Sequence, residues 1–193
     1  EPGKSLIIAN NAQNHLATNP NSFDLSTADF EWYDKSTSAS NQDVDNPDVT
    51  NLDIWFTYSL SVWILHDRGY EGYIISLPPY GMTMDSYLEN YKWEGKYINH
   101  SLAGDFEMSI AKAYKIPNSW VLDGVNTAVE ENFQYTSWDE SIDAGWTHCG
   151  KIDKDPERYG KSVLRKRGDD GKLIDTNNST NDFTPDATPS LKK

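Results

Sequence analysis

Hydrophobic and polar residues alternate most clearly in the middle of the chain. Over residues 52–64 the even positions are all apolar, and most of the odd positions between them are polar. This two-residue period predicts a β-strand, because successive side chains of a strand point to opposite faces. The segment is long for one strand, so we expect a bend near residues 57–61. A turn at 66–69 and a second β-rich run at 70–77 then predict a hairpin.

Three more segments have the composition of strands, namely residues 4–10, 120–127 and 162–167. Short helices are predicted behind three residues that can cap a first turn: Ser26 ahead of Phe30, Thr83 ahead of residues 84–93, and Asp105 ahead of residues 106–114. In the last segment Phe106, Ile110 and Ala113 would share one helix face. The whole pattern predicts an all-β fold, an antiparallel β-sandwich with long loops and a few short helices.

Length and composition limit the domain organisation. The chain has 193 residues, with seven Trp, eleven Tyr and six Phe that a folded domain must largely cover. We expect one domain over residues 1–183 and an extended polar tail over 184–193, where Pro185 and Pro189 fall. Cys149 is the sole cysteine, so no internal disulfide can form.

The charge balance excludes some partners. There are 17 basic and 30 acidic residues, which gives a formal net charge of −13. Such a chain repels phosphate backbones and anionic lipid, so we expect no nucleic-acid partner and no direct docking on a lipid surface. No apolar run approaches the roughly 18 residues that a membrane-spanning helix needs.

An acidic loop is the first candidate for a site. Asp43, Asp45 and Asp48 place three carboxylates close together, and hard cations such as Ca²⁺ bind oxygen ligands at this density. Pro47, however, stands at the fifth position of the loop, so the EF-hand pattern fails. A solvated acidic loop is therefore the interpretation we favour, with no metal and no cofactor. Residues 175–182 also echo a calcium loop, but Asx turns explain them better, because Thr180 stands where that loop needs Gly.

Known catalytic motifs do not identify an enzymatic activity in this sequence. The histidines lack zinc-protease spacing, and we find no nucleophile elbow, Walker or dinucleotide pattern. His148 and Cys149 are neighbours, so on a strand their side chains would point apart, and we expect a structural cysteine. Many carboxylate pairs could serve a glycoside hydrolase, so that class is a third, least favoured hypothesis. No catalytic residue is assigned.

Tryptophans are the remaining candidates for contact with a ligand or partner. Trp55 and Trp63 fall on the polar side of the alternating segment, and with Trp93 they are our candidates. Exposed Trp can stack on a sugar or anchor a protein interface. The alternative for each is ordinary packing in the core.

Several segments together resemble one family. They are PGKSLIIA at 2–9, NAQNH at 11–15, DLSTADFE at 24–31, IPNSWVLDGV at 116–125, YGKSVLRK at 159–166 and DTNNSTNDF at 175–183. The set resembles a Bacteroidetes surface-lipoprotein domain of unknown function, itself similar to lamin-tail domains. The resemblance implies an immunoglobulin-like β-sandwich, lipid-anchored at the outer membrane and facing outward. The opening strands and the lipid-bearing cysteine of that family would precede Glu1.

The resemblance also implies a function, because such lipoproteins are often encoded beside TonB-dependent importers and their lid lipoproteins. We therefore expect a non-enzymatic accessory subunit of an outer-membrane nutrient importer. Its expected partners are the importer barrel and its lid lipoprotein, with an oligosaccharide or a peptide as ligand. The alternative is a surface glycan-binding module that uses exposed Trp.

Overall fold

The computed structural model describes residues 4–33, 43–57, 71–101, 103–133 and 138–190. The chain divides into two compact units that interleave in sequence. Unit 1 comprises Glu1–Leu65, Tyr159–Lys161 and Thr188–Lys193, and unit 2 comprises His66–Arg158 and Ser162–Ala187. The expectation of one domain over residues 1–183 stays a prediction.

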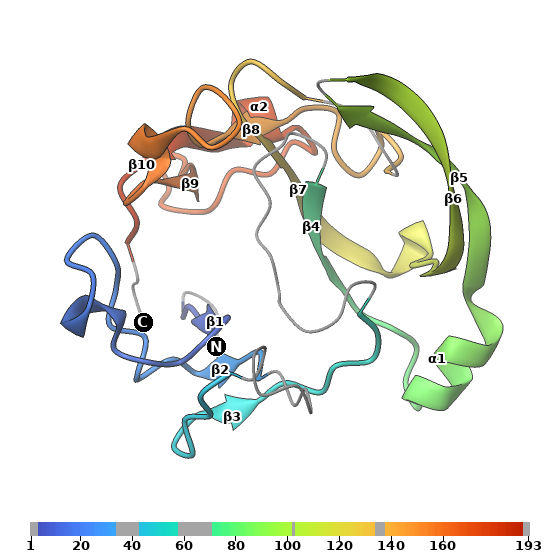
Figure 1. The fold of residues 1–193 in the computed structure, drawn as a ribbon, viewed down its shortest axis with the longest axis horizontal. Coiled ribbons are helices and arrows are strands. Elements are labelled where there is room, and N and C mark those ends of the chain that lie inside the picture. The colour runs from blue at the N-terminus through green and yellow to red at the C-terminus, as the bar shows by residue number, and fades with distance from the viewer. Residues whose placement is uncertain (1–3, 34–42, 58–70, 102, 134–137, 191–193) are drawn as a thin grey trace. The chain divides into compact units, whose positions relative to one another are not determined.

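Unit 1 contains a small parallel sheet, drawn in blue and cyan in Figure 1. Its strands, in the order β1-β2-β3, are Ile8–Ala9, Phe30–Glu31 and Thr50–Asn51, and a 3₁₀ turn, η1, covers His15–Ala17. Small side chains form its core, namely Ala9, Ala12, Ala28 and Val49. The carboxylate of Glu31 is buried beside them and accepts the backbone N–H groups of Ala12 (2.9 Å) and Asn46 (3.0 Å). These bonds satisfy the buried charge, as burial requires.

Two sequence predictions in unit 1 are wrong. Ser26 does not start a helix, because its N–H and hydroxyl donate to Asp24 Oδ1 at 3.0 and 2.6 Å, and this local turn leads directly into β2. The strand predicted over residues 52–64 is not formed at 52–57, since pairing with β2 ends where Leu52 N–H donates to the carbonyl of Glu31. The rest of that segment, with the bend and the turn at 66–69, lies outside the described residues.

Unit 2 holds most of the strands. Its three-stranded sheet has the order β4-β7-β8, with β4 at Glu71–Ser76, β7 at Val121–Ala128 and β8 at Thr147–His148. A long curved hairpin joins β5 (Lys92–Ser101) to β6 (Gly104–Tyr114), and β9 (Ser162–Arg165) pairs with β10 (Phe183–Ala187) (Figure 1). The helices are short: α1 at Met84–Asn90, α2 at Ser179–Asp182, and 3₁₀ turns η2 at Asn118–Trp120 and η3 at Pro156–Arg158. This confirms an all-β fold with mostly antiparallel pairing and a few short helices.

Several predictions for unit 2 are confirmed and two are wrong. The strands predicted at 70–77, 120–127 and 162–167 are present as β4, β7 and β9. The helix predicted at 106–114 is wrong: that segment is β6, where Phe106, Met108 and Ile110 alternate along one face and β5 supplies the backbone partner. The tail predicted over 184–193 starts later than expected, because residues 184–187 belong to β10.

Helix α1 is stabilised by its cap and by aromatic packing. Thr83 accepts the Ser86 N–H at 3.2 Å, which confirms the predicted cap. Tyr87 and Tyr91 stack with ring centroids 5.5 Å apart, and Tyr87 also packs against Tyr114 at 5.7 Å. Trp120 completes the cluster 4.8 Å from Tyr91. The cluster therefore ties α1 to the end of β6 and to η2.

A separate aromatic residue, Trp138, packs across the β4–β7 pair. A Cβ atom added at Gly72 of β4 or at Gly124 of β7 would overlap the indole ring of Trp138. The ring thus covers this part of the sheet at a distance that only glycine permits.

None of the helices in the described residues has the length and hydrophobicity of a membrane-spanning segment.

Candidate functional site

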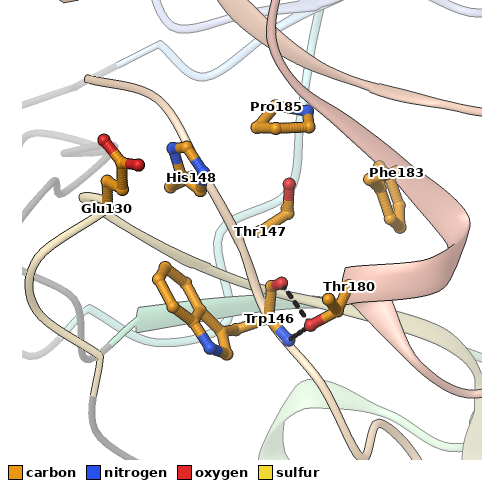
Figure 2. A pocket seen from close by; sticks show the side chains of 7 residues that line it. All are labelled: Glu130, Trp146, Thr147, His148, Thr180, Phe183 and Pro185. Carbon is orange, nitrogen blue, oxygen red and sulfur yellow. Dashed lines mark hydrogen bonds between the residues drawn. The ribbon is translucent and has the colours of Figure 1, made fainter. Parts of the chain in front are cut away.

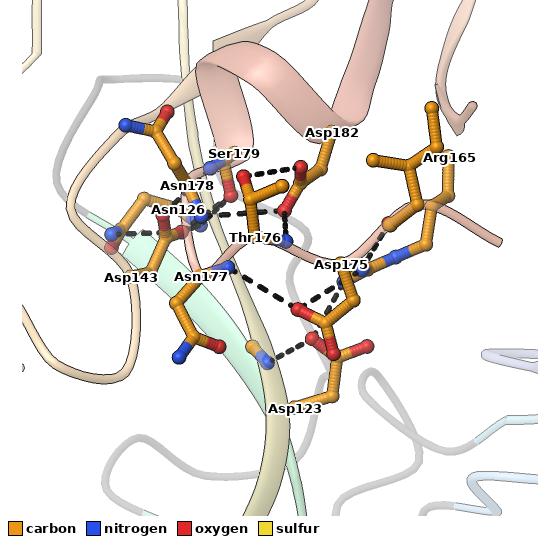
Figure 3. A network of polar contacts seen from close by, with 12 residues as sticks. Asp123, Asn126, Asp143, Arg165, Asp175, Thr176, Asn177, Asn178, Ser179 and Asp182 are labelled. Atoms are coloured by element: carbon orange, nitrogen blue, oxygen red, sulfur yellow. Dashed lines mark hydrogen bonds and ion pairs between the residues drawn. The ribbon is translucent and has the colours of Figure 1, made fainter. Parts of the chain in front are cut away.

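A buried polar network in unit 2 positions the candidate site (Figure 3). The carboxylate of Asp143, 1% exposed, accepts the backbone N–H groups of Asn126 (2.9 Å), Gly145 (3.0 Å) and Ser179 (2.7 Å). It also accepts the Asn126 side-chain amide at 3.2 Å and the Ser179 hydroxyl. The network therefore joins β7, the loop before β8, and the start of α2.

Asp182 and Arg165 extend this network toward β10. Asp182, 2% exposed, accepts the Thr176 N–H at 2.8 Å and the Thr176 hydroxyl at 2.7 Å. Arg165 forms an ion pair with Asp123 at 2.6 Å and donates to the carbonyl of Ile174 at 2.9 Å. Its guanidinium carbon lies 4.6 Å from the centre of the Phe183 ring. These contacts fix the first residue of β10, which is one wall of the pocket described next.

An open pocket of about 240 Å³ lies where β8 faces α2 and β10 (Figure 2). It is lined by Glu130, Trp146, Thr147, His148, Thr180, Phe183 and Pro185, and we call it the Trp146 pocket. The Trp146 backbone N–H donates to the Thr180 hydroxyl oxygen at 3.1 Å, and that hydroxyl donates to the Trp146 carbonyl at 2.8 Å. This reciprocal pair fixes Trp146 against α2.

The walls of the Trp146 pocket are largely aromatic. Phe133 stacks parallel to Trp146, with centroids 5.1 Å and planes 6° apart, and so supports the indole. His148 lies 5.7 Å from Trp146 with its ring tilted by 47°. With Phe183 and Pro185 on the β10 side, the pocket offers flat apolar surfaces.

Two polar atoms of the pocket residues have no hydrogen-bond partner. Thr147 is 2% exposed, and its Oγ1 is buried and unpaired. Nδ1 of His148 is likewise buried and unpaired, and lies 3.8 Å from Asp186 Oδ2, beyond hydrogen-bonding distance. Asp186 instead accepts the Gly150 N–H at 2.8 Å through Oδ1. The coincidence of these two buried atoms with an aromatic pocket marks it as a candidate binding site.

A different surface of unit 2 is apolar and exposed. On one face of the β5–β6 hairpin, Tyr97 lies opposite Met108, and Phe106 is two residues from Met108 on the same strand. These side chains are 37%, 42% and 45% exposed for Tyr97, Met108 and Phe106 respectively. We call them the hairpin face. The opposite face carries the exposed ion pair between Lys96 and Glu107, 2.6 Å long.

The comparisons with known proteins identify a family. The family described as a protein of unknown function, DUF4876, matches residues 1–190. The chain belongs to the DUF4876 family. The predicted resemblance to a domain of unknown function is confirmed at this level, while the lamin-tail likeness and the lipid anchor stay predictions.

A solved structure supports the fold. The DUF4876 chain is similar to a DUF4876 family protein from Bacteroides thetaiotaomicron VPI-5482, with a TM-score of 0.63 and 23% sequence identity. The match covers 98% of this chain and 50% of that chain, so the DUF4876 chain spans half the length of its structural relative. At this identity the likeness shows the fold alone. A search of curated proteins found no match.

The two predicted Trp candidates that the structure describes lie in different units of the DUF4876 chain. Trp55 is half-buried in unit 1, and Trp93 is half-buried on β5 of unit 2, with its ring over Gly95. Trp63 lies outside the described residues. The pocket instead uses Trp146, which sequence reasoning did not select. The sequence shows Trp146, Thr147 and His148 as neighbours, but the other side of the pocket is formed by Thr180, Phe183 and Pro185, more than thirty positions later.

The acidic loop of the DUF4876 chain is organised around the side-chain amide of Asn46. Asp45 and Asp48 are exposed, and Asp45 Oδ1 accepts the Asn51 side-chain amide at 3.0 Å. Asn46 donates its side-chain amide to the carbonyls of Ala12 (2.8 Å) and Ser26 (3.0 Å). Asp43 is half-buried at the start of the loop. Within the part of the chain that the structure describes, no three His, Cys, Asp or Glu residues gather as a metal site.

The other two candidates from the sequence, residues 175–182 and Cys149, make contacts that stabilise the fold. Asp175 Oδ1 accepts the Asn177 N–H at 3.3 Å, an Asx turn, and Asn178 caps α2 by accepting from Thr180 and Asn181. These contacts match the Asx-turn interpretation of residues 175–182. Cys149 is half-buried, and its Sγ lies 3.7 Å from the carbonyl of Arg158. This matches a structural cysteine.

Proposed function

We propose that the chain is a non-enzymatic accessory domain of a TonB-dependent outer-membrane nutrient importer. It acts at the extracellular face of a bacterial outer membrane, held there by a lipid anchor outside this chain. Its partners are the importer barrel and its lid lipoprotein. The proposal starts from the family resemblance in the sequence, and membership of the DUF4876 family and a Bacteroides structural relative agree with that origin.

The observation that carries the proposal is the hairpin face. Tyr97, Phe106 and Met108 are adjacent, apolar and each more than a third exposed. An isolated two-stranded hairpin is marginally stable in water, and a contiguous exposed apolar patch is typical of a protein-interaction site. Aromatic side chains also dominate the binding energy of interfaces. The hairpin face is therefore the surface we assign to the importer.

The net charge of −13 would act on the rate of association. Charges at the rim of an interface attract a partner over distances near the Debye length, about 8–10 Å at physiological salt. Added salt should therefore slow association while the dissociation rate stays nearly constant, because the apolar contacts are not screened. A durable complex should bury at least about 1,000 Å² in total.

The test is co-purification from the native host. The chain is tagged at Lys193, membranes are solubilised mildly, and the proteins that co-elute at low and high salt are identified. The importer barrel and lid lipoprotein should co-elute with the wild type and be lost from a Tyr97→Ser/Met108→Ser variant. A Lys96→Ser/Glu107→Ser variant on the opposite face is the matched control and should retain them. Recovery of the wild-type chain alone at both salt concentrations would contradict the proposal.

A further inference from the structure

We propose that the Trp146 pocket binds one neutral sugar ring. The inference goes beyond the accessory role, because the pocket and the hairpin face share no residue and can be tested separately. Three observations carry it: the size of the pocket, its aromatic walls, and the two buried polar atoms without partners. Each restricts the chemistry of the occupant.

The pocket has the size and surface for a single ring. Its volume of about 240 Å³ is below the roughly 300–1,000 Å³ of pockets for drug-sized ligands, so one sugar ring is the scale of occupant that it fits. Trp146 and Phe183 offer flat apolar surfaces, and the C–H face of a pyranose is the complementary surface. Because Phe133 supports one side of the Trp146 ring, the indole is held in place before a ligand arrives.

The unpaired atoms indicate a ligand rich in hydroxyl groups. Thr147 Oγ1 can donate and accept, and Nδ1 of His148 can do either, depending on the tautomer. Sugar hydroxyls also donate and accept, so they can pair with either atom whichever role that atom takes. Leaving such atoms unpaired is unfavourable, and a hydroxyl that reaches them from the pocket removes that cost.

The charge of the lining favours a neutral occupant. Glu130 is the charged residue of the lining, and it is exposed. Among the described residues no Lys or Arg lines the pocket, so a phosphate or an acidic sugar would meet the Glu130 carboxylate without a lysine or arginine to pair with. A quaternary ammonium could pair with Glu130, but its methyl groups offer no hydrogen bond to Thr147 Oγ1 or His148 Nδ1. The hydroxyl groups of a neutral sugar can bond with Glu130 and with either of these atoms.

The experiment titrates the full chain with small probes by calorimetry and by Trp fluorescence. The probes are methyl glucoside, methyl mannoside, methyl galactoside and N-acetylglucosamine, with glucuronate and choline as charged comparators. At least one neutral sugar should bind in the millimolar range expected for so few contact atoms, and more tightly than either charged probe. Trp146→Phe should abolish the fluorescence change, whereas Trp93→Phe should preserve it.

The decisive variant is Thr147→Val, which keeps the shape of the side chain and removes the hydroxyl. It should weaken sugar binding about tenfold, because a hydrogen bond is lost. The melting temperature should not fall, since the hydroxyl has no partner within the protein. Thr147→Ser should restore binding. No saturation by any neutral sugar, tighter binding of choline or glucuronate, or equal binding by Thr147→Val would overturn the assignment.

Discussion

Ser179 donates both its backbone N–H and its hydroxyl to the carboxylate of Asp143, 36 residues earlier in the chain. Asn126 and Gly145 donate to the same carboxylate, so one buried charge holds three segments of unit 2 together. We expect Asp143→Ala to lower the free energy of unfolding by about 3–5 kcal/mol, because it leaves several buried donors without an acceptor. Urea unfolding monitored by circular dichroism measures the loss.

The control for Asp143 lies a few residues away. Asp139 is exposed and accepts the Ser141 N–H at 2.9 Å, so it has the same chemistry without the burial. Asp139→Ala should leave the free energy of unfolding nearly unchanged. Equal effects of the two substitutions would show that Asp143 does not organise unit 2.

The contact of Trp138 with two glycines gives a second prediction. Gly124→Ala should destabilise unit 2 by about 1–3 kcal/mol, because the new methyl group overlaps the indole ring. The same substitution should cost clearly less in a Trp138→Leu background, where the ring is absent. A double-mutant cycle from urea unfolding measures the difference. Additive costs would mean that Trp138 does not pack on Gly124.

Short-range signals in the sequence predicted the strands and caps that depend on local pattern. Thr83 caps α1, and β7 and β9 form where β-rich runs occur. The helix predicted at 106–114 failed because Phe106 and Ile110 fit a helical spacing and an alternating one equally well. The choice between them was made by β5, a partner strand that supplies the backbone hydrogen bonds.

The candidate site was harder to predict for the same reason. Trp146 becomes a pocket wall only because Thr180 holds its backbone and Phe183 lines the same pocket, and both come from the far end of unit 2. A sequence shows that a Trp is present, but not which surfaces meet around it. The buried role of Asp143 was equally hidden, because thirty acidic residues look alike until the fold buries a few of them.

The aromatic cluster beside α1 gives a pH dependence. Burial raises the pKa of Tyr87 above its ordinary value, and the neighbouring Tyr114 adds to the shift. Below the unfolded pKa of about 10, both states keep the proton and the full stability is present. As pH rises through the folded pKa that stability is lost, because the unfolded chain releases the proton more readily.

Tyr87→Phe removes this ionisation and tests the effect. The free energy of unfolding of the wild type should fall more steeply above about pH 10 than that of the variant, and the two should run in parallel below it. Urea unfolding at several values between neutral and alkaline pH gives both curves. Parallel curves over the whole range would contradict a buried, shifted Tyr87.

The acidic loop of unit 1 gives the last prediction, on metal removal. Asn46 donates to the carbonyls of Ala12 and Ser26, and its Oδ1 accepts the Asp48 N–H at 3.1 Å. The loop is therefore ordered by an amide, and EDTA should leave the melting temperature unchanged. Asn46→Ala should cost about 2–3 kcal/mol, since it leaves the two carbonyls unpaired, and Asp48→Ala should cost far less, because that side chain is exposed.

A bound cation would give the reverse pattern. If Asp43, Asp45 and Asp48 held Ca²⁺, the folded state would gain stability by mass action, and EDTA would lower the melting temperature by several degrees. Added Ca²⁺ would reverse that drop, and Asp45→Ala would abolish the response to either reagent. Differential scanning calorimetry of the wild type, Asn46→Ala and Asp45→Ala, each with EDTA and with Ca²⁺, separates the two cases. Only an amide-ordered loop makes Asn46→Ala the most destabilised of the three while none of them responds to EDTA.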